Sequence, residues 1–199
     1  MNKPVLVAAP VYWNKWLDRW FRCYFKLTYP SKGVVVATEA VRLAEEIRNK
    51  YRVQVLLINL EPYAIIDRVF HIAAAREAIR RYFVYSPYDY LLFIDSDIEY
   101  PPDTIEKMFS ICGDADMCWS TKPTTIMMMN RRTAMSIRYV TAKVFDTEAN
   151  IYLEENREVI HQLKHYNALC SCRVGKECFK LKEFRATWAR HQDKPLGEY

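Results

Sequence analysis

Two aspartates, Asp95 and Asp97, follow an apolar stretch and are separated by a single serine. The stretch before them, 90–94, reads Tyr-Leu-Leu-Phe-Ile, which is typical of a strand buried on both faces. Side chains at i and i+2 of a strand point the same way, so the two carboxylates leave the strand together and repel each other. A hard divalent cation such as Mg²⁺ or Mn²⁺ removes that repulsion, because it prefers oxygen ligands and takes one or two carboxylates plus substrate phosphates.

The pattern therefore predicts a metal-bound diphosphate site at Asp95 and Asp97. The other interpretation is that both are turn and capping residues, since aspartate is common in such positions. A short helix is expected directly after them, opened by Pro101-Pro102-Asp103, with Asp103 and Glu106 placed as in a capping box. A strand before the pair and a helix after it favour the metal site.

The elements that must position these carboxylates alternate between strand and helix. Apolar runs predict strands at 5–9, 34–37, 53–60 and 90–94, and helical spacing predicts helices at 13–26, 41–51 and 67–85. This alternation is typical of a mostly parallel, doubly wound α/β sheet. Ligands bind beyond the carboxyl ends of such strands, where Pro10, Tyr12, Glu39, Asp95 and Asp97 all lie.

In the second half of the chain the regular alternation of strand and helix is lost. Strands are expected at 116–121, 126–130, 137–145 and 168–174, and the charged stretch 148–164 predicts a helix plus loop. We expect one domain, in which 1–97 form a nucleotide-binding half and 98–199 an appended α+β half. The length of 199 residues and the hydrophobic content of 51% suit a single domain with a real core.

Net charge and glycine content limit the kinds of ligand that the protein is expected to bind. A net charge of +5 suits an anionic ligand or an anionic membrane surface, and does not by itself indicate nucleic acid. Only four glycines are present, and neither G-x-G-x-x-G nor G-x-x-x-x-G-K occurs, which argues against a Gly-rich phosphate loop. No apolar run resembles a signal peptide or a membrane span, so the expected compartment is the cytoplasm.

The six cysteines form no C-x-x-C pair, and in a cytosolic chain they are expected to be buried free thiols. A zinc site is the alternative, because His161 and His165 precede Cys170, Cys172 and Cys178. Their spacings fit no standard zinc pattern. The zinc interpretation leads to a non-enzymatic, zinc-stapled nucleic-acid-binding protein as one alternative function.

The stretch "YDYLLFIDSDIEYPPDTIEKM" resembles the central block of GT-A glycosyltransferases, especially the large group with an inverting, glycan-building core. "VLVAAPVY" and "LTYPSKGVVVATEA" are similar to the first two strands of that family, and Ala75-Arg76-Glu77 is similar to its Ala-Arg-Asn. The resemblance implies a GT-A, Rossmann-like fold and an acceptor half after residue 97. It covers most of residues 4–121 and is weaker beyond them.

The resemblance also implies roles for individual residues. Pro10 and Tyr12 occupy the base-contacting turn, and Glu39 takes the place of an acidic residue that meets the base or ribose. Arg76 is implied to lie near the phosphates, although an exposed helix arginine is the alternative. Asp97 is implied to bind Mn²⁺ or Mg²⁺ directly, and Asp95 to bind it through water or to hold the ribose.

The C-terminal "PLGEY" resembles the Gly-Glu-Asp that supplies the catalytic carboxylate of the family. Glu198 is therefore the implied base that deprotonates the acceptor, with Asp146 and Glu148 in reserve. The implied reaction is metal-dependent, inverting transfer of a sugar from a nucleotide-sugar donor to a hydroxyl of a glycan, protein or lipid-linked acceptor. A sugar-nucleotide pyrophosphorylase is the enzymatic alternative, but "AAPVYWNK" lacks the Gly-rich loop that it needs.

The predicted helix at 13–26 has an aromatic face with three tryptophans and a basic stripe of Lys15, Arg19, Arg22 and Lys26. In a core helix the face covers the sheet, and Trp13, Trp16 and Trp20 are completely buried. In an interfacial helix at least one tryptophan stays open and the stripe meets anionic lipid. The second interpretation allows peripheral membrane contact, which would suit a membrane-displayed acceptor.

Overall fold

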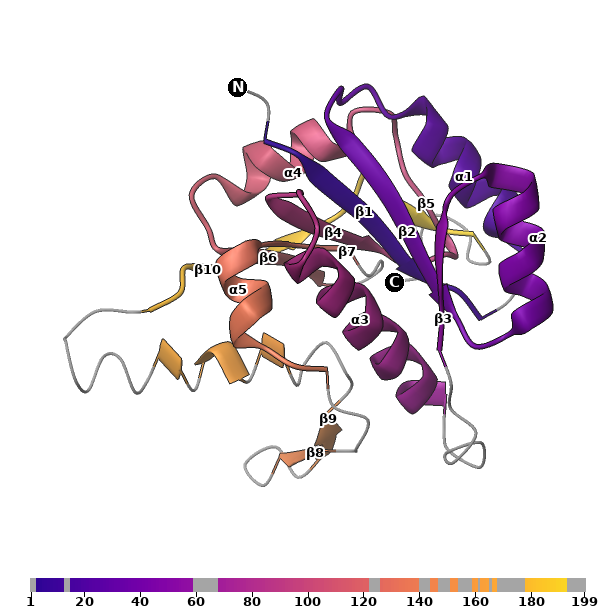
Figure 1. The fold of residues 1–199 in the computed structure, drawn as a ribbon. Coiled ribbons are helices and arrows are strands. Elements are labelled where there is room, and N and C mark those ends of the chain that lie inside the picture. The colour runs from indigo at the N-terminus through magenta and orange to yellow at the C-terminus, as the bar shows by residue number, and fades with distance from the viewer. Residues whose placement is uncertain are drawn as a thin grey trace.

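The computed structural model describes residues 3–12, 15–58, 68–121, 126–139, 144–146, 151–153, 159–160, 162–164, 166–167 and 178–192; at 68–70, 144–146 and 151–153 it describes the backbone alone. A seven-stranded sheet forms the centre, in the order β10-β6-β7-β4-β1-β2-β3 (Figure 1). Strands β1 to β4 are mutually parallel, and β7 runs antiparallel to its neighbours β4 and β6. The mostly parallel, doubly wound sheet predicted from the sequence is confirmed.

The central sheet is built from β1 (Val5–Pro10), β2 (Lys32–Thr38), β3 (Gln54–Leu57), β4 (Tyr90–Ile94), β6 (Met117–Thr121), β7 (Ile126–Asn130) and β10 (Leu181–Arg185). Two small antiparallel pairs are β5 (Ile98–Glu99) with β11 (Arg190–His191), and β8 (Val144–Asp146) with β9 (Ile151–Leu153). The helices are α1 (Leu17–Lys26), α2 (Val41–Tyr51), α3 (Arg68–Val84), α4 (Thr104–Cys112) and α5 (Arg131–Ser136).

Helices cover both faces of the sheet, and alternate strand residues supply the two cores. Val5, Val7 and Ala9 of β1 pack with α1, α2 and α4, whereas Leu6 and Ala8 pack with α3 and α5. The two groups of helices lie on opposite sides of the strands in Figure 1. Because successive side chains of a strand point to opposite faces, near-continuous apolar strands can bury both sets.

Helix α1 is a core helix. Trp20 and Phe21 are fully buried, and the Trp20 indole N–H donates to the Ile94 carbonyl at 3.2 Å. That bond ties α1 to the end of β4, directly before Asp95. The core interpretation is right for Trp20 and wrong for Trp16, which is only half-buried, while Trp13 lies outside the described residues.

Helix α5 is not predicted by the sequence pattern. The Asn130 side chain caps it by accepting from the Thr133 N–H at 2.9 Å, and the Arg131 guanidinium donates to carbonyls just past α3, including Ser86 at 2.7 Å. The predicted strand at 137–145 is wrong at its start. Ile137 and Tyr139 are buried in alternation, as in a strand, but the Tyr139 N–H donates to the Glu77 carboxylate at 3.1 Å instead of to a neighbouring strand.

The capping box expected at α4 is also wrong. The Asp103 carboxylate pairs with Lys107, and Glu106 accepts from the Thr28 hydroxyl at 2.9 Å. Glu106 thus joins α4 to the loop before β2 instead of closing its own helix. The strand expected at 168–174 lies outside the described residues.

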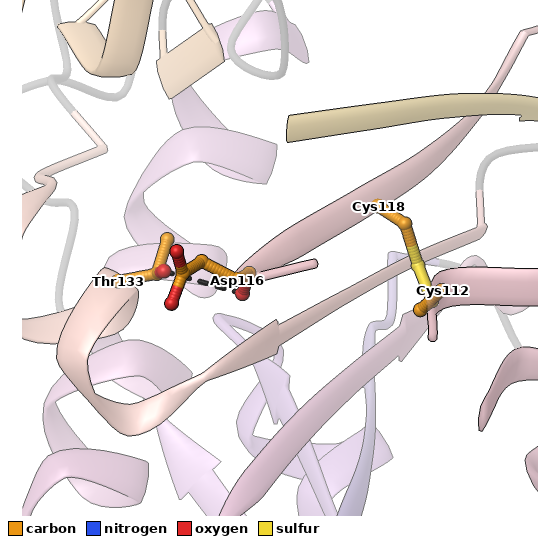
Figure 2. Close-up of a disulfide and its surroundings, with 4 residues drawn as sticks. All are labelled: Cys112, Asp116, Cys118 and Thr133. Atoms are coloured by element: carbon orange, nitrogen blue, oxygen red, sulfur yellow. Dashed lines mark hydrogen bonds between the residues drawn. A yellow bond between two sulfur atoms is a disulfide. The ribbon is translucent and has the colours of Figure 1, made fainter. Parts of the chain in front are cut away.

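The expectation of free thiols is wrong for Cys112 and Cys118, which form a disulfide between the end of α4 and β6 (Figure 2). Figure 2 also shows Asp116, whose carbonyl accepts from the Thr133 hydroxyl at 3.2 Å. Cys178 is disulfide-bonded as well, whereas Cys23 is a half-buried free thiol whose pKa is raised by burial. Of the predicted zinc ligands, His161, His165, Cys170 and Cys172 lie outside the described residues.

In the part of the chain that the structure describes, none of the helices has the length and apolar character that crossing a membrane requires.

Candidate functional site

A pocket lies at the carboxyl edge of the sheet, where β1, β2 and β4 end. Five residues that the sequence predicts for the site line it: Pro10, Tyr12, Glu39, Asp95 and Asp97. Strand β2 follows β1 on one side, and β4 pairs with β1 on the other, so the strand order reverses beside β1. Crevices at such a reversal are where doubly wound sheets bind ligands.

Asp95 is held by a buried arginine. Arg76 Nη2 donates to Asp95 Oδ1 at 2.7 Å, and the Arg76 side chain is only 1% exposed. Its guanidinium also lies 5.5 Å from the centre of the Phe93 ring. The alternative of an exposed helix arginine is therefore excluded. A buried guanidinium next to a carboxylate compensates the charge of Asp95 and fixes its orientation at the end of β4.

Asp97 is held by a residue that the sequence analysis missed. His191 Nε2 lies 2.8 Å from Asp97 Oδ2, and both side chains are mostly buried. The short strand β11 brings the histidine there by pairing with β5, and the Gln192 N–H donates to the Asp97 carbonyl at 2.9 Å. No local pattern around His191 indicates this contact, because it depends on two segments far apart in sequence.

A third cluster lies at the end of β2. The His71 Nδ1 is hydrogen-bonded to Glu39 Oε2, and the His71 and Tyr12 rings meet edge to face with their centres 5.7 Å apart. His71, Ile72 and Ala75 line the pocket from α3. Position 71 precedes Arg76 on the same helix, so α3 both lines the pocket and holds Asp95.

Glu77, which replaces the asparagine of the Ala-Arg-Asn pattern, serves the fold instead. Its carboxylate accepts from Arg80 Nε at 2.7 Å and Arg81 Nε at 2.9 Å, besides the Tyr139 N–H. Burial raises the pKa of Glu77, but the hydrogen bonds from Arg80 and Arg81 outweigh it, so the pKa falls below its usual value. Glu77 thereby anchors the segment after α5.

The donor atoms suit a divalent cation that shares its coordination with a substrate. Asp97 offers a carboxylate oxygen and His191 an imidazole nitrogen, both of which are ligands for Mn²⁺. Among the described residues, no three His, Cys, Asp or Glu side chains gather closely enough to hold a metal by themselves. A metal here would need phosphate or water oxygens to complete its shell, as Mg²⁺ and Mn²⁺ commonly do.

The predicted catalytic residue is not part of the described site. Glu198 and its reserve Glu148 lie outside the described residues, and Asp146 is described only as backbone in β8. The role of Glu198 stays a prediction.

No protein-family model matches this sequence, and no curated protein matches it. Solved structures do resemble it. S. aureus TarS 1-349 has a TM-score of 0.56 and 12% identity over 92% of this chain and 58% of that one. Glucosyl-3-phosphoglycerate synthase from Mycobacterium tuberculosis, solved with Mn²⁺, uridine diphosphate and glucosyl-3-phosphoglycerate, has a TM-score of 0.54 and 12% identity over 98% of this chain and 74% of that one.

These similarities define the class of fold: the chain has the Rossmann-like GT-A fold of nucleotide-diphospho-sugar glycosyltransferases. The chain spans 58% of the length of TarS 1-349 and 35% of another S. aureus TarS structure. At 12 to 13% identity, the likeness extends to the fold, and the activity has to be argued from the site.

Proposed function

We propose that this protein transfers a sugar from a nucleotide-diphosphate-sugar donor to an acceptor hydroxyl, with a divalent metal on the diphosphate. The observation that carries the proposal is the pocket where β1 and β4 end, which gathers Asp95 and Asp97 with Tyr12 and Glu39. The two carboxylates suit the metal-bound diphosphate of a nucleoside diphosphate, and the aromatic and acidic side chains suit its nucleoside. The pocket lies beyond the carboxyl ends of the strands, and ligand binding at that edge of a doubly wound sheet supports the proposal.

Asp97 and His191 would hold the metal. When bound, a divalent ion neutralises negative charge on a departing diphosphate and acts as a Lewis acid. Arg76 takes Asp95 Oδ1, which favours an indirect role for Asp95, through water or the ribose. The Mn²⁺ and uridine diphosphate of the M. tuberculosis synthase structure support this choice of metal and ligand.

The remaining pocket residues would bind the nucleoside. Tyr12 has 45% of its surface exposed and can offer its ring to a base, and the Glu39 carboxylate can accept from base or ribose donors. Pro10 ends β1 and shapes the turn that carries Tyr12. The Arg76 guanidinium adds positive charge behind the predicted phosphate position.

On the acceptor side, Glu198 would be the carboxylate that removes the acceptor proton, with inversion at the transferred carbon. A glycan, a protein or a lipid-linked acceptor would each supply the hydroxyl. No feature of the described residues favours the pyrophosphorylase or nucleic-acid alternatives.

The proposal is tested by calorimetry with uridine, guanosine, cytidine, thymidine and adenosine diphosphates, each with Mn²⁺ or with a chelator. We expect at least one to bind much more tightly with Mn²⁺, and Asp97→Ala to abolish the difference. Equal binding with and without metal would refute the metal site. A screen for hydrolysis of nucleotide sugars with Mn²⁺ and Mg²⁺ then identifies the donor, and no turnover of any donor by a chain that binds nucleotide would count against transfer.

A further inference from the structure

His71 is a titratable residue in the pocket wall. It is not among the residues proposed to bind the metal or the nucleotide. It lies one turn into α3 and its side chain is 16% exposed, so it is part of the pocket wall. Both of its described partners, Glu39 and Tyr12, are residues proposed to bind the nucleoside. One side chain thus contacts both proposed nucleoside contacts at once.

The contact with Glu39 fixes a flexible side chain. Glu39 follows β2 directly and its side chain is 27% exposed, so without a partner it would sample several rotamers. The hydrogen bond to His71 Nδ1 engages Oε2 and holds the carboxylate against the pocket wall. A carboxylate has lone pairs on both oxygens, so it can still accept from a ligand while it is held. The conformational entropy of the Glu39 side chain is then already lost in the free protein, so binding a ligand does not have to order it.

The contact with Tyr12 fixes the plane of an exposed ring. Tyr12 lies just beyond β1, and the preceding residue is bound to β2 through the Val11 N–H and the Ala37 carbonyl at 2.8 Å. The interplanar angle of 79° between Tyr12 and His71 is an edge-to-face packing, which aromatic pairs prefer. The packing sets the direction in which the exposed face of Tyr12 points.

We propose that His71 is a positioning residue that preorganises Glu39 and Tyr12 for the nucleoside end of the donor. The inference rests on the proposed function, because it assigns a nucleotide to this pocket. His71 would act through its two neighbours and would not contact the diphosphate or the metal, since those are assigned to Asp95, Asp97 and His191 at the ends of β4 and β11.

The test separates the two ends of the ligand. Calorimetry with Mn²⁺ compares the nucleoside diphosphate that the wild type binds most tightly with inorganic pyrophosphate, which lacks the nucleoside. For His71→Ala we expect nucleotide affinity to fall about tenfold, the effect of losing roughly one hydrogen bond. Pyrophosphate affinity should stay within about twofold of the wild type, since the phosphate end keeps all its residues.

Two conservative variants divide the effect. His71→Asn retains an N–H near the Nδ1 position and should recover the share of the lost nucleotide affinity that depends on the contact with Glu39. His71→Phe retains a ring for Tyr12 but no donor, and should recover less if the Glu39 contact dominates. Melting temperatures of all three variants report whether the fold is intact.

The inference is overturned if His71→Ala binds the nucleotide as well as the wild type, or if it loses nucleotide and pyrophosphate equally. A wild type that binds neither ligand with Mn²⁺ overturns the proposed function itself, and this inference with it. Asp97→Ala should lose both ligands, which marks the phosphate end and distinguishes the two kinds of failure.

Discussion

Asp97 and His191 meet at 2.8 Å because β11 pairs with β5, the short strand that begins directly after the aspartate. In the same pairing, Arg190 lies opposite Glu99 and its Nη2 is 2.6 Å from the Glu99 carboxylate. Neighbouring residues of β11 thus contact two acidic residues on either side of Ile98. The candidate metal site is therefore completed by a late segment of the chain, fastened by a backbone ladder and an ion pair.

Removing His191 should weaken the metal site more than the fold. For His191→Ala we expect Mn²⁺-dependent nucleotide affinity to fall by at least about tenfold to a hundredfold, the usual cost of losing a residue that only supports a metal ligand. Binding in the presence of a chelator should not change. Gln192→Ala is the matched control, because its backbone N–H remains available to the Asp97 carbonyl. A lower melting temperature without a change in Mn²⁺ dependence would show that the histidine only supports the fold through its contact with Asp97.

Glu77 should make stability depend on pH. Its pKa is lower in the folded protein than the ordinary 4.5, so its contribution is complete above that value and is lost as pH falls through the folded pKa. Glu77→Gln removes an acceptor shared by Arg80 and the Tyr139 N–H, and should cost about 2 kcal/mol at pH 7.

The measurement is urea unfolding of the wild type and Glu77→Gln from pH 7 to pH 3. The difference in unfolding free energy should shrink below about pH 4.5, the ordinary value for a glutamate. Glu45→Gln on the exposed side of α2 is the control and should be neutral. A Glu77→Gln deficit in unfolding free energy that is constant across this range would contradict a stabilising role for the ion pairs of Glu77.

The central strands were predictable because their signal is local. The predicted strand at 90–94 has the bounds that the structure shows, and the aspartates after it line the pocket as strand ends should. A run of apolar residues needs no knowledge of its partner, because both faces of a parallel strand are covered. Five of the predicted site residues meet in one pocket for the same reason.

His71 and His191 could not be found in this way. Each acquires its role from a side chain on another element, Glu39 or Asp97, and neither stands in a recognisable motif. In the segment at 137–139, by contrast, a local pattern is present but is only partly informative. Its alternation correctly indicates that Ile137 and Tyr139 are buried, but alternation reports burial and not pairing, and the segment packs under α3 without joining the sheet.

The disulfide between Cys112 and Cys118 should stabilise the protein. Both residues are buried, and the bond closes a loop with a sequence separation of 6. Closing that loop lowers the conformational entropy of the unfolded chain, which stabilises the folded protein by about 2 kcal/mol. The Cys112→Ser, Cys118→Ser double variant should lose about that much in urea unfolding. Thiol titration under denaturing conditions provides an independent check, since free thiols at both positions in protein purified without reductant would contradict the bond.

Trp20 of α1 should be more costly to remove than Trp16, which precedes the helix. It is fully buried, packs against Phe21 and Tyr100, and donates to the Ile94 carbonyl. Trp20→Ala should lower the unfolding free energy by about 3–5 kcal/mol. Trp16→Ala should cost less, because Trp16 is half-buried, and it should instead alter ligand binding, because Trp16 lines the pocket. Equal destabilisation by the two substitutions would contradict the assignment of Trp20 to the core and Trp16 to the pocket.

The remaining prediction concerns membrane contact by α1. Its aromatic face is occupied by the core, and three of the four cations of the predicted basic stripe have partners. Lys15 lies over the Trp16 ring, Arg19 lies 3.7 Å from the Glu99 carboxylate, and the Arg22 Nε donates to the Asp18 carbonyl at 3.4 Å. Phe25, which is 56% exposed, lies beside Arg22 and Lys26 and is the main apolar group left for lipid on the described part of this helix.

Those three residues are too few for stable membrane binding. Burying a phenylalanine yields about 2 kcal/mol and each cation near an anionic surface about 1 kcal/mol, which together correspond to a dissociation constant near the millimolar range. We therefore expect the protein to stay at the bottom of a gradient with anionic liposomes, even at low salt. Phe25→Ser should behave identically and keep its melting temperature, because its ring is largely exposed. Flotation of the wild type that Phe25→Ser abolishes would contradict this expectation and make α1 an interfacial helix.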